Sequence, residues 1–374
     1  MKNRRSDLLL TLLFCAFLGG MLLLFLLWPQ AAFSVREKRY LAKAPELSAE
    51  TLRSGRFGDD AETWCADHLP GRDFFVTVNA HALRLANLQV TQPIYVGQSG
   101  RLYERPAVND PAVIRRNMEA INAFAEAVGQ KVDLLLVPSA GCLLREDIRG
   151  LADDYPDEEL IAAAAALAGD RVRPLSLLPL FQAAEDPAAL YYRTDHHWTS
   201  LGAYLAADFY TGVSGRSLPP AEDYSVTRED GFRGTTYARA CLWETPAESL
   251  ELWNGGGRYE VCFSEREGSF DRLFFPERLT EEDKYPVWLD GNHPLVRIRN
   301  LDPEAEGRIL VIRDSYANCM GCFLADAWRE VVLADLRYYR QPLTELCREE
   351  AFDQILVLYS VGNFMTDSNI VKLA

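Results

Sequence analysis

The segment RILVIRDSYAN, residues 308–318, joins a short apolar run to a polar turn and a predicted helix. An apolar run without polar alternation is typical of a strand buried on both faces, as in a parallel sheet. In such proteins the reactive groups follow the carboxyl ends of the strands. Ser315 stands there, where a helix N-terminus favours negative charge developing on a substrate oxygen. The segment predicts an α/β fold with a candidate nucleophile at Ser315.

The same alternation of apolar runs and helical segments extends over much of the chain. The expected strands are Val132–Pro138, Arg171–Leu177, Arg308–Ile312, Glu330–Leu336 and Gln354–Tyr359. The expected helices are Phe74–Leu88, Pro111–Val128, Glu158–Ala168, Thr199–Tyr210, Tyr316–Trp328 and Pro342–Phe352. Helices between doubly apolar strands predict a three-layer α/β domain with a mostly parallel sheet. The run Ile94–Tyr103, with its Gly-x-x-Gly turn, predicts a hairpin.

The domain organisation follows from where this alternation begins and breaks. It breaks down over about 218–300, where Gly, Trp, Tyr and polar residues dominate and predict an irregular, partly β insertion. We expect a cytoplasmic tip and signal-anchor helix over 1–34, a juxtamembrane stalk over 35–73, and one α/β domain over 74–374.

The N-terminus predicts a membrane anchor. Lys2, Arg4 and Arg5 precede an uncharged apolar stretch, Leu8–Trp28, which at about 1.5 Å per residue spans about 30 Å as a helix. A cleaved secretory signal has a shorter apolar region, and Pro29–Phe33 offers only a poor cleavage site, although this alternative stays open. The basic flank places the N-terminus in the cytoplasm. We expect a single-pass protein of the cell membrane whose C-terminal domain is extracytoplasmic.

Composition excludes several classes of protein. The 374 residues are 48% hydrophobic and 25% charged, which is ordinary for a globular chain and excludes disorder, collagen and coiled coil. The net charge of −15 opposes binding to a phosphate backbone, so no nucleic acid partner is expected. Outside Cys15 there are seven cysteines, and their pairing does not follow from the sequence. Cys319 and Cys322 are expected to be small buried side chains or one local disulfide.

A second segment, YYRTDHHWT at residues 191–199, supplies partners for Ser315. In an extended loop, side chains at i and i+2 point the same way, so Asp195 is expected to orient His197 while His196 points away. Thr199 would cap the following helix. Together these residues predict a Ser-His-Asp arrangement in which His197 activates Ser315. The alternatives that Asp-Ser is only a helix cap, and that the histidines are structural, stay open.

No metal ion or other cofactor is expected. His196 and His197 are adjacent and are expected to diverge too far to share one tetrahedral ion, and the sequence has no HExxH motif or second Cys/His cluster. The triplet Asp195-His196-His197 also resembles that of the DHH phosphoesterases. Those enzymes need further aspartate motifs for two metal ions, and the resemblance stops at the triplet.

The motif Asp195-His196-His197-Trp198 resembles the one that gives the DHHW proteins their name. The resemblance extends over nearly the whole chain, through Pro70–Asp73, Ile94–Tyr103, Arg313–Ala317 and Asp335–Tyr339. That family is similar to the SGNH-hydrolase-like domains of alginate O-acetyltransferases, where an Asp-x-His-Trp segment precedes the serine block in a permuted order. The resemblance implies an acetyl-ester enzyme outside the membrane, often paired with a membrane-bound O-acyltransferase that exports the acyl group.

Carried over residue by residue, the resemblance implies a catalytic triad of Ser315, His197 and Asp195. Val137–Ala140 resembles a block that continues with a lysine in the alginate enzymes, and because that lysine is missing here, uronate polymers are not implied. Val361–Asn363 resembles the Gly-x-Asn block whose amide forms part of the oxyanion hole in SGNH enzymes. The candidates for oxyanion or substrate binding are Tyr316, Asn363, Ser139, His196 and Arg193.

The function that the resemblance implies is O-acetylation of a cell-surface glycan. Two alternatives stay open, a carbohydrate esterase and a non-catalytic accessory protein that binds the glycan or the acyltransferase. Aromatic residues of the insertion would stack on sugar rings or form local core, and these are Trp243, Trp253, Tyr259 and Trp288.

Overall fold

The computed structural model describes residues 4–34, 37, 39–85, 90–91, 94–148 and 155–373. The chain forms two compact units. The first comprises Met1–Leu88 with Cys241–Trp243, and the second comprises Gln89–Ala240 with Glu244–Ala374. The predicted boundary between residues 73 and 74 stays a prediction.

The first unit is mostly helical, with α1 (Arg4–Leu27), α2 (Ala49–Ser54), α3 (Arg56–Asp67), α4 (Arg72–Leu85) and the paired strands β1 (Phe33–Ser34) and β2 (Arg39–Tyr40). Within α1, Ser6–Leu27 has a mean hydropathy of 2.6 and none of it is buried. This helix is long and apolar enough to cross a membrane. Helix α4 is the helix expected at Phe74, and residues 35, 36 and 38 of the expected stalk lie outside the described residues.

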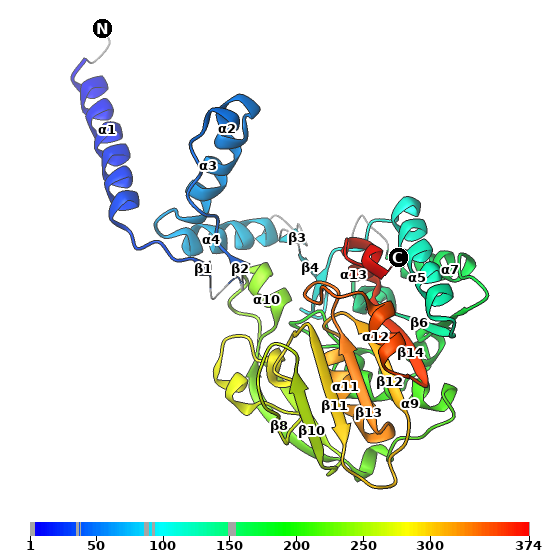
Figure 1. Cartoon of the computed structure of the whole chain (residues 1–374). Helices are drawn as coiled ribbons and strands as arrows, with labels where there is room; N and C mark the ends of the chain where they lie inside the picture. Colours follow the sequence, from blue (N-terminus) through cyan, green and yellow to red (C-terminus); the bar gives the residue numbers. More distant parts are fainter. Residues whose placement is uncertain are drawn as a thin grey trace. The chain divides into compact units, whose positions relative to one another are not determined.

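The second unit is built on a seven-stranded sheet in the order β10-β11-β13-β12-β14-β6-β7 (Figure 1). Strands β13, β12, β14, β6 and β7 are parallel, whereas β11 is antiparallel to both β13 and β10. The bounds are β6 (Val132–Val137), β7 (Val172–Ser176), β10 (Tyr259–Phe263), β11 (Leu295–Asn300), β12 (Arg308–Arg313), β13 (Glu330–Ala334) and β14 (Gln354–Ser360). The five strands predicted from apolar runs are the five parallel ones.

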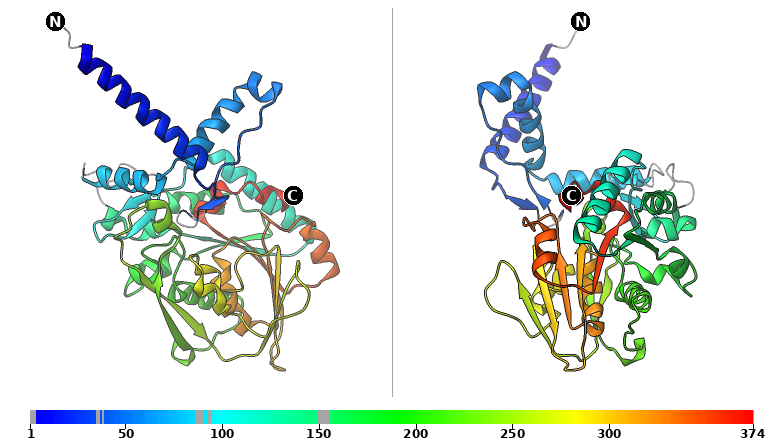
Figure 2. Two further views of the ribbon diagram at one scale, coloured as in Figure 1. Left: turned by 90° about the vertical axis from the view of Figure 1, so that its left-hand side faces the viewer. Right: turned by 45° about the vertical axis from the view of Figure 1, so that its right-hand side comes forward.

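Helices cover both faces of this sheet (Figure 2). Alternate side chains of β12 enter two separate cores, with Ile309 and Val311 in one and Leu310 and Ile312 in the other. The first core includes α9 (Ser200–Val213) and α11 (Ala317–Ala327). The second includes α5 (Pro111–Val128), α7 (Asp157–Ala166), α12 (Leu343–Glu349) and α13 (Val361–Thr366). The predicted three-layer α/β fold is therefore confirmed.

Local sequence signals explain the best-predicted element, α5. Asp110 caps its N-terminus by accepting a hydrogen bond from the N–H of Ala112, and Pro111 occupies the first turn. Gly129 follows the last turn with φ 69°, a left-handed conformation that glycine adopts without a Cβ penalty. The expected hairpin is also present, with β4 (Ile94–Val96) antiparallel to β5 (Leu102–Glu104) and to the short β3 (Val90–Thr91).

The insertion is more closely joined to the sheet than we expected. Its strands β8 (Ser225–Phe232) and β9 (Glu248–Asn254) form a separate pair, but β10 and β11 extend the main sheet in antiparallel orientation. Tyr259 and Trp288 are buried and Trp253 packs against the same core, so these three aromatic residues are local core. Cys319 and Cys322 form no disulfide and are buried in α11 as small side chains.

Candidate active site

The turn that carries Ser315 lies where β12 ends and α11 begins, as predicted. The buried carboxylate of Asp314 fixes this turn by accepting hydrogen bonds from the N–H of Tyr316 at 3.0 Å and from the N–H and hydroxyl of Ser360 at 2.8 and 2.9 Å. It also accepts one from Nδ2 of Asn363 at 2.8 Å. Because Ser360 ends β14 and Asn363 lies in α13, one carboxylate ties the serine turn to the neighbouring strand end.

The loop that carries the motif is closed by a bridge between Tyr191 and Trp198. Thr199 caps α9 as predicted, because its hydroxyl accepts a hydrogen bond from the N–H of Gly202. The indole N–H of Trp198 donates to the carbonyl of Tyr316 at 3.1 Å, which joins the motif loop to the serine turn. The buried guanidinium of Arg101 donates to three carbonyl oxygens at the base of the loop, each at 2.8 Å. The loop is therefore held from both sides.

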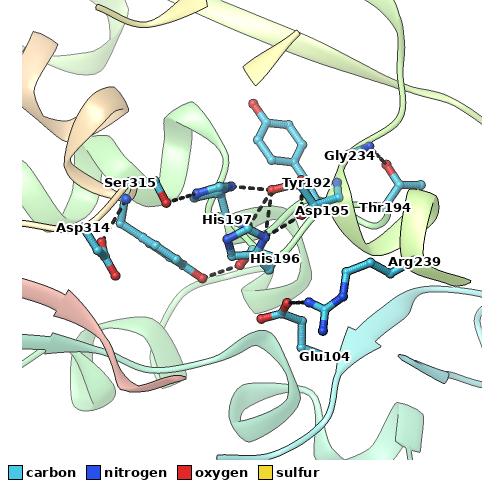
Figure 3. A network of polar contacts seen from close by, with 12 residues as sticks. Glu104, Tyr192, Thr194, Asp195, His196, His197, Gly234, Arg239, Asp314 and Ser315 are labelled. Carbon is cyan, nitrogen blue, oxygen red and sulfur yellow. Dashed lines mark hydrogen bonds and ion pairs between the residues drawn. The ribbon is translucent and has the colours of Figure 1, made fainter. Parts of the chain in front are cut away.

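These two segments bring Ser315, His197 and Asp195 into a row (Figure 3). Nδ1 of His197 lies 2.5 Å from Oδ1 of Asp195, and Nε2 lies 2.7 Å from Oγ of Ser315. A carboxylate can only accept, so Nδ1 carries the proton and Nε2 accepts the Ser315 hydroxyl. The three side chains have the contacts that the sequence predicted.

His196 differs from the expectation that it points away. Its ring centroid lies 3.8 Å from that of His197, with 37° between the ring planes. The loop bends instead of running extended between its bridged ends, so the alternation of side chains does not hold there. The expected divergence of the two rings is therefore wrong. Asp195, His196 and His197 offer ligand atoms within 4.8 Å of one another. Both ring nitrogens of His197, however, are engaged in hydrogen bonds.

Asp195 is fully enclosed and hydrogen-bonded on both oxygens. Oδ1 accepts from the N–H and Nδ1 of His197, and Oδ2 accepts from the N–H and hydroxyl of Thr235 at 2.6 and 3.0 Å. Burial opposes ionisation, but the two histidines and these hydrogen bonds outweigh it and hold the pKa of Asp195 well below its usual value. Burial, with the adjacent His196, lowers the pKa of His197 against the opposing effect of Asp195. A neutral His197 beside an ionised Asp195 is the state that a general base needs.

Several residues that hold the triad come from the insertion and were missed by the sequence analysis. The Tyr285 ring stacks on His197 with a centroid distance of 3.7 Å and an interplanar angle of 12°. The Glu248 carboxylate accepts from the N–H groups of Arg193 and Thr194, at 2.8 and 2.7 Å, just before Asp195. Gly234 lies so close to the Asp195 side chain that a Cβ would overlap it. Only their place in the fold reveals these roles, because no local motif marks them.

A cavity lies beside Asp195, and its volume of about 60 Å³ has room for a few water molecules. Four of the five candidates for substrate or oxyanion binding line it, namely Ser139, His196, Tyr316 and Asn363. Arg193 does not line it, since its guanidinium donates to the carbonyl of Ser99. Asp195 also lines the cavity, whereas His197 and Ser315, to which it is linked by hydrogen bonds, do not.

Some of these candidates already have hydrogen-bond partners. The Tyr316 N–H is donated to Asp314, and one Nδ2 hydrogen of Asn363 is donated to the same carboxylate. Ser139 caps the short α6 (Ala140–Leu143), and its N–H donates to Asp157 at 2.6 Å. No hydrogen bond of the Ser315 N–H is found within the described part of the chain. That N–H and the second Nδ2 hydrogen of Asn363 are therefore donors for which the described residues provide no partner.

The chain is an SGNH-like α/β protein. Its features are a mostly parallel sheet between two helix layers, a serine turn at the carboxyl end of β12, and a histidine motif that precedes the serine in the chain. Residues 97–225 match the family model of the SGNH hydrolase-like domain of the acetyltransferase AlgX. The matched segment includes the motif loop and ends before Ser315. This match confirms the resemblance to O-acetyltransferase SGNH domains.

Solved structures share the fold. A DHHW family protein from Eubacterium siraeum superposes with a TM-score of 0.64 at 20% identity, over 73% of this chain and 92% of that chain. Bacillus cereus PatB1 with a sulfonyl adduct gives 0.64 at 20% identity, over 75% and 97% of the two chains. No curated protein sequence matches this chain.

Proposed function

We propose that this chain is an extracytoplasmic O-acetyltransferase that acts on a cell-surface glycan through Ser315, His197 and Asp195. The observation that carries the proposal is the row of contacts from Asp195 through His197 to Ser315, with 2.5 and 2.7 Å between the bonded atoms. An isolated helix cap would need neither a buried imidazole nor a buried carboxylate behind it. The family match over residues 97–225 directs this nucleophile toward acetyl esters.

The first half of the reaction transfers the acetyl group to the enzyme. Nε2 of His197 takes the Oγ proton as Ser315 attacks the carbonyl carbon of the donor ester, and the carbonyl electrons move onto its oxygen. That oxyanion would be stabilised by the Ser315 N–H and the second Nδ2 hydrogen of Asn363. The intermediate then expels the donor alcohol, which takes the proton from His197, and an acetyl-Ser315 ester remains.

The second half passes the acetyl group to the glycan. A glycan hydroxyl loses its proton to Nε2 of His197 while its oxygen attacks the acetyl carbon, and Ser315 leaves with that proton. Water in place of the glycan would give acetate, so exclusion of water decides between transferase and esterase.

The N-terminal helix supports the proposed location. Ser6–Leu27 would anchor the chain in the membrane, with the second unit on the outer side facing the glycan. A membrane-bound O-acyltransferase that exports acetyl groups is the partner that such a location requires, since activated acyl donors are made in the cytoplasm.

Acetyl content of the glycan tests this proposal. The full-length chain, Ser315→Ala and the exposed control Ser217→Ala are each returned to a deletion strain, and acetate released by mild alkali from the isolated cell-surface glycan is measured. We expect wild-type and Ser217→Ala protein to restore acetylation and Ser315→Ala protein to fail. A higher acetyl content in the deletion strain would instead identify an esterase, and restoration by Ser315→Ala would identify an accessory protein.

A further inference from the structure

His196 has one ring nitrogen bonded and one without a partner. Nδ1 lies 2.7 Å from the hydroxyl oxygen of Thr235, and no partner of Nε2 is found in the described parts of the chain. The side chain is 21% exposed and lines the cavity beside the triad. The position of the single ring proton decides whether this nitrogen offers a donor or an acceptor to a ligand.

The hydroxyl of Thr235 fixes that proton. It lies 3.0 Å from Oδ2 of Asp195, which is ionised and can only accept, so the single hydroxyl hydrogen of Thr235 points at Asp195. The Thr235 oxygen must then accept from Nδ1 of His196, which therefore carries the proton. Nδ1 of His196 also lies 3.7 Å from Oδ1 of Asp195, a position that favours a proton on this nitrogen. Asp195 thus sets the tautomer of both histidines, of His197 directly and of His196 through Thr235.

The uncommitted groups on the cavity wall include the guanidinium of Arg105, which lies over the Tyr95 ring, and the second Nδ2 hydrogen of Asn363, and both are donors. The hydroxyls of Tyr103, Tyr155 and Ser360, which line it, are donated to Asp147, the carbonyl of Glu104 and Asp314. The Glu104 carboxylate is paired with Arg239. Nε2 of His196, which carries a lone pair and no proton, is therefore a hydrogen-bond acceptor available to a ligand in the cavity.

We infer that His196 binds the acceptor glycan. Its Nε2 accepts a hydrogen bond from the hydroxyl next to the one that receives the acetyl group. The inference rests on the proposed function and adds to it a positioning residue and a substrate class, an acceptor with at least two neighbouring hydroxyls. His196 takes no proton in the reaction. The ring centroids of His196 and His197 lie 3.8 Å apart, so a hydroxyl bound at His196 would lie near the histidine that activates Ser315.

The tautomer is tested on the full-length chain in detergent, labelled with 15N-histidine, by long-range 1H–15N NMR with the His196 signal assigned from His196→Gln. We expect the Nδ1–H form in the wild type and in Thr235→Ser. Thr235→Val removes the hydroxyl, and the His196 ring should then populate the Nε2–H form. An Nε2–H form of His196 in the wild type would overturn the inference.

Substrate binding is tested with p-nitrophenyl acetate as donor and two acceptors, methanol and methyl β-glucopyranoside. We expect His196→Phe to lower kcat/KM for the glucoside about tenfold more than for methanol, through KM, since one hydrogen bond is lost only with the sugar. His196→Gln, whose carbonyl replaces the acceptor, should recover part of this ratio. An unchanged ratio in His196→Phe overturns the inference. Wild-type protein that acetylates neither acceptor would overturn the proposed function instead, while the tautomer experiment would still decide this inference.

Discussion

Replacing Gly234 with alanine should inactivate the site although none of the three triad residues is substituted. A Cβ at residue 234 would lie 2.1 Å from Oδ2 of Asp195 and 2.2 Å from its Cβ. Ordinary van der Waals contact begins at about 3.4 Å, so Asp195 or the residue 234 backbone must move by about 1.3 Å. Asp195 cannot retreat freely, because four hydrogen bonds from His197 and Thr235 hold it.

The expected loss of rate depends on how far Asp195 moves and on which of its hydrogen bonds break. A displacement of about 1 Å in a catalytic array costs on the order of 10²-fold in rate, and complete loss of the carboxylate that orients a histidine costs about 10⁴-fold. We therefore expect acetylation of Ser315 by Gly234→Ala to fall by roughly 10²- to 10⁴-fold. Strained or lost hydrogen bonds to a buried carboxylate should also reduce the free energy of unfolding by about 2–3 kcal/mol.

The assay is the burst of p-nitrophenol released from p-nitrophenyl acetate, with stability measured by urea unfolding at 25 °C. Gly212→Ala in α9 is the matched control, since no atom lies within 4 Å of its added Cβ. That control should keep the wild-type burst and gain up to about 1 kcal/mol from helix propensity. A Gly234→Ala protein with a wild-type burst rate would show that a fixed Asp195 is not needed.

Three further predictions follow from the site and the N-terminal helix. Because the pKa of His197 is lowered, mainly by burial, its neutral form should persist below the usual value of about 6.5, and the burst rate should fall only as pH drops through a midpoint under that value. Because the pKa of His197 is lower in the folded than in the unfolded chain, the unfolded chain takes up this proton first as pH falls. The free energy of unfolding should therefore decrease as pH falls from above 6.5 through the folded-state pKa. A midpoint above 6.5 would contradict both statements. Tyr285→Ala should admit water to the His197 ring and raise the midpoint of the burst rate, whereas Tyr285→Phe, which keeps the stacked ring, should leave that midpoint near the wild-type value. Identical midpoints in the two variants would argue against shielding of His197 by Tyr285. Protease added to cells stripped of outer layers should digest the chain beyond about residue 35, whereas complete protection would contradict an anchor at Ser6–Leu27 with an outward-facing domain.

Local signals account for the part of the structure that the sequence could predict. β12 was predictable because each of its inner side chains is apolar and enters one of two cores, and α5 because Asp110, Pro111 and Gly129 mark its ends. The position of Ser315 was predictable from its strand end, whereas its contact with His197 was predicted from a spacing that assumes an extended loop and is present although the loop bends.

Nonlocal contacts account for what the sequence could not predict. Glu248 and Tyr285 reach the motif loop from segments 50 residues or more further along the chain, and neither stands in a motif of its own. The antiparallel pairing of β11 with β13 likewise could not be predicted, because β11 stands in the irregular insertion and no local pattern indicates its partner strand. The orientation of His196 was wrongly predicted because it depends on bends that follow from the Tyr191–Trp198 bridge rather than from residue spacing.

Catalysis by Ser315 is tested most directly by finding where a sulfonyl fluoride, a class of reagent that attacks activated serine hydroxyls, labels the protein. The full-length chain in detergent is incubated with the reagent, digested, and mapped by mass spectrometry beside Ser217→Ala and His197→Ala. We expect one adduct, on Ser315, that is present in Ser217→Ala and forms at least about 10²-fold more slowly in His197→Ala. A protein that stays unlabelled, or that is labelled equally fast without His197, would contradict catalysis by Ser315.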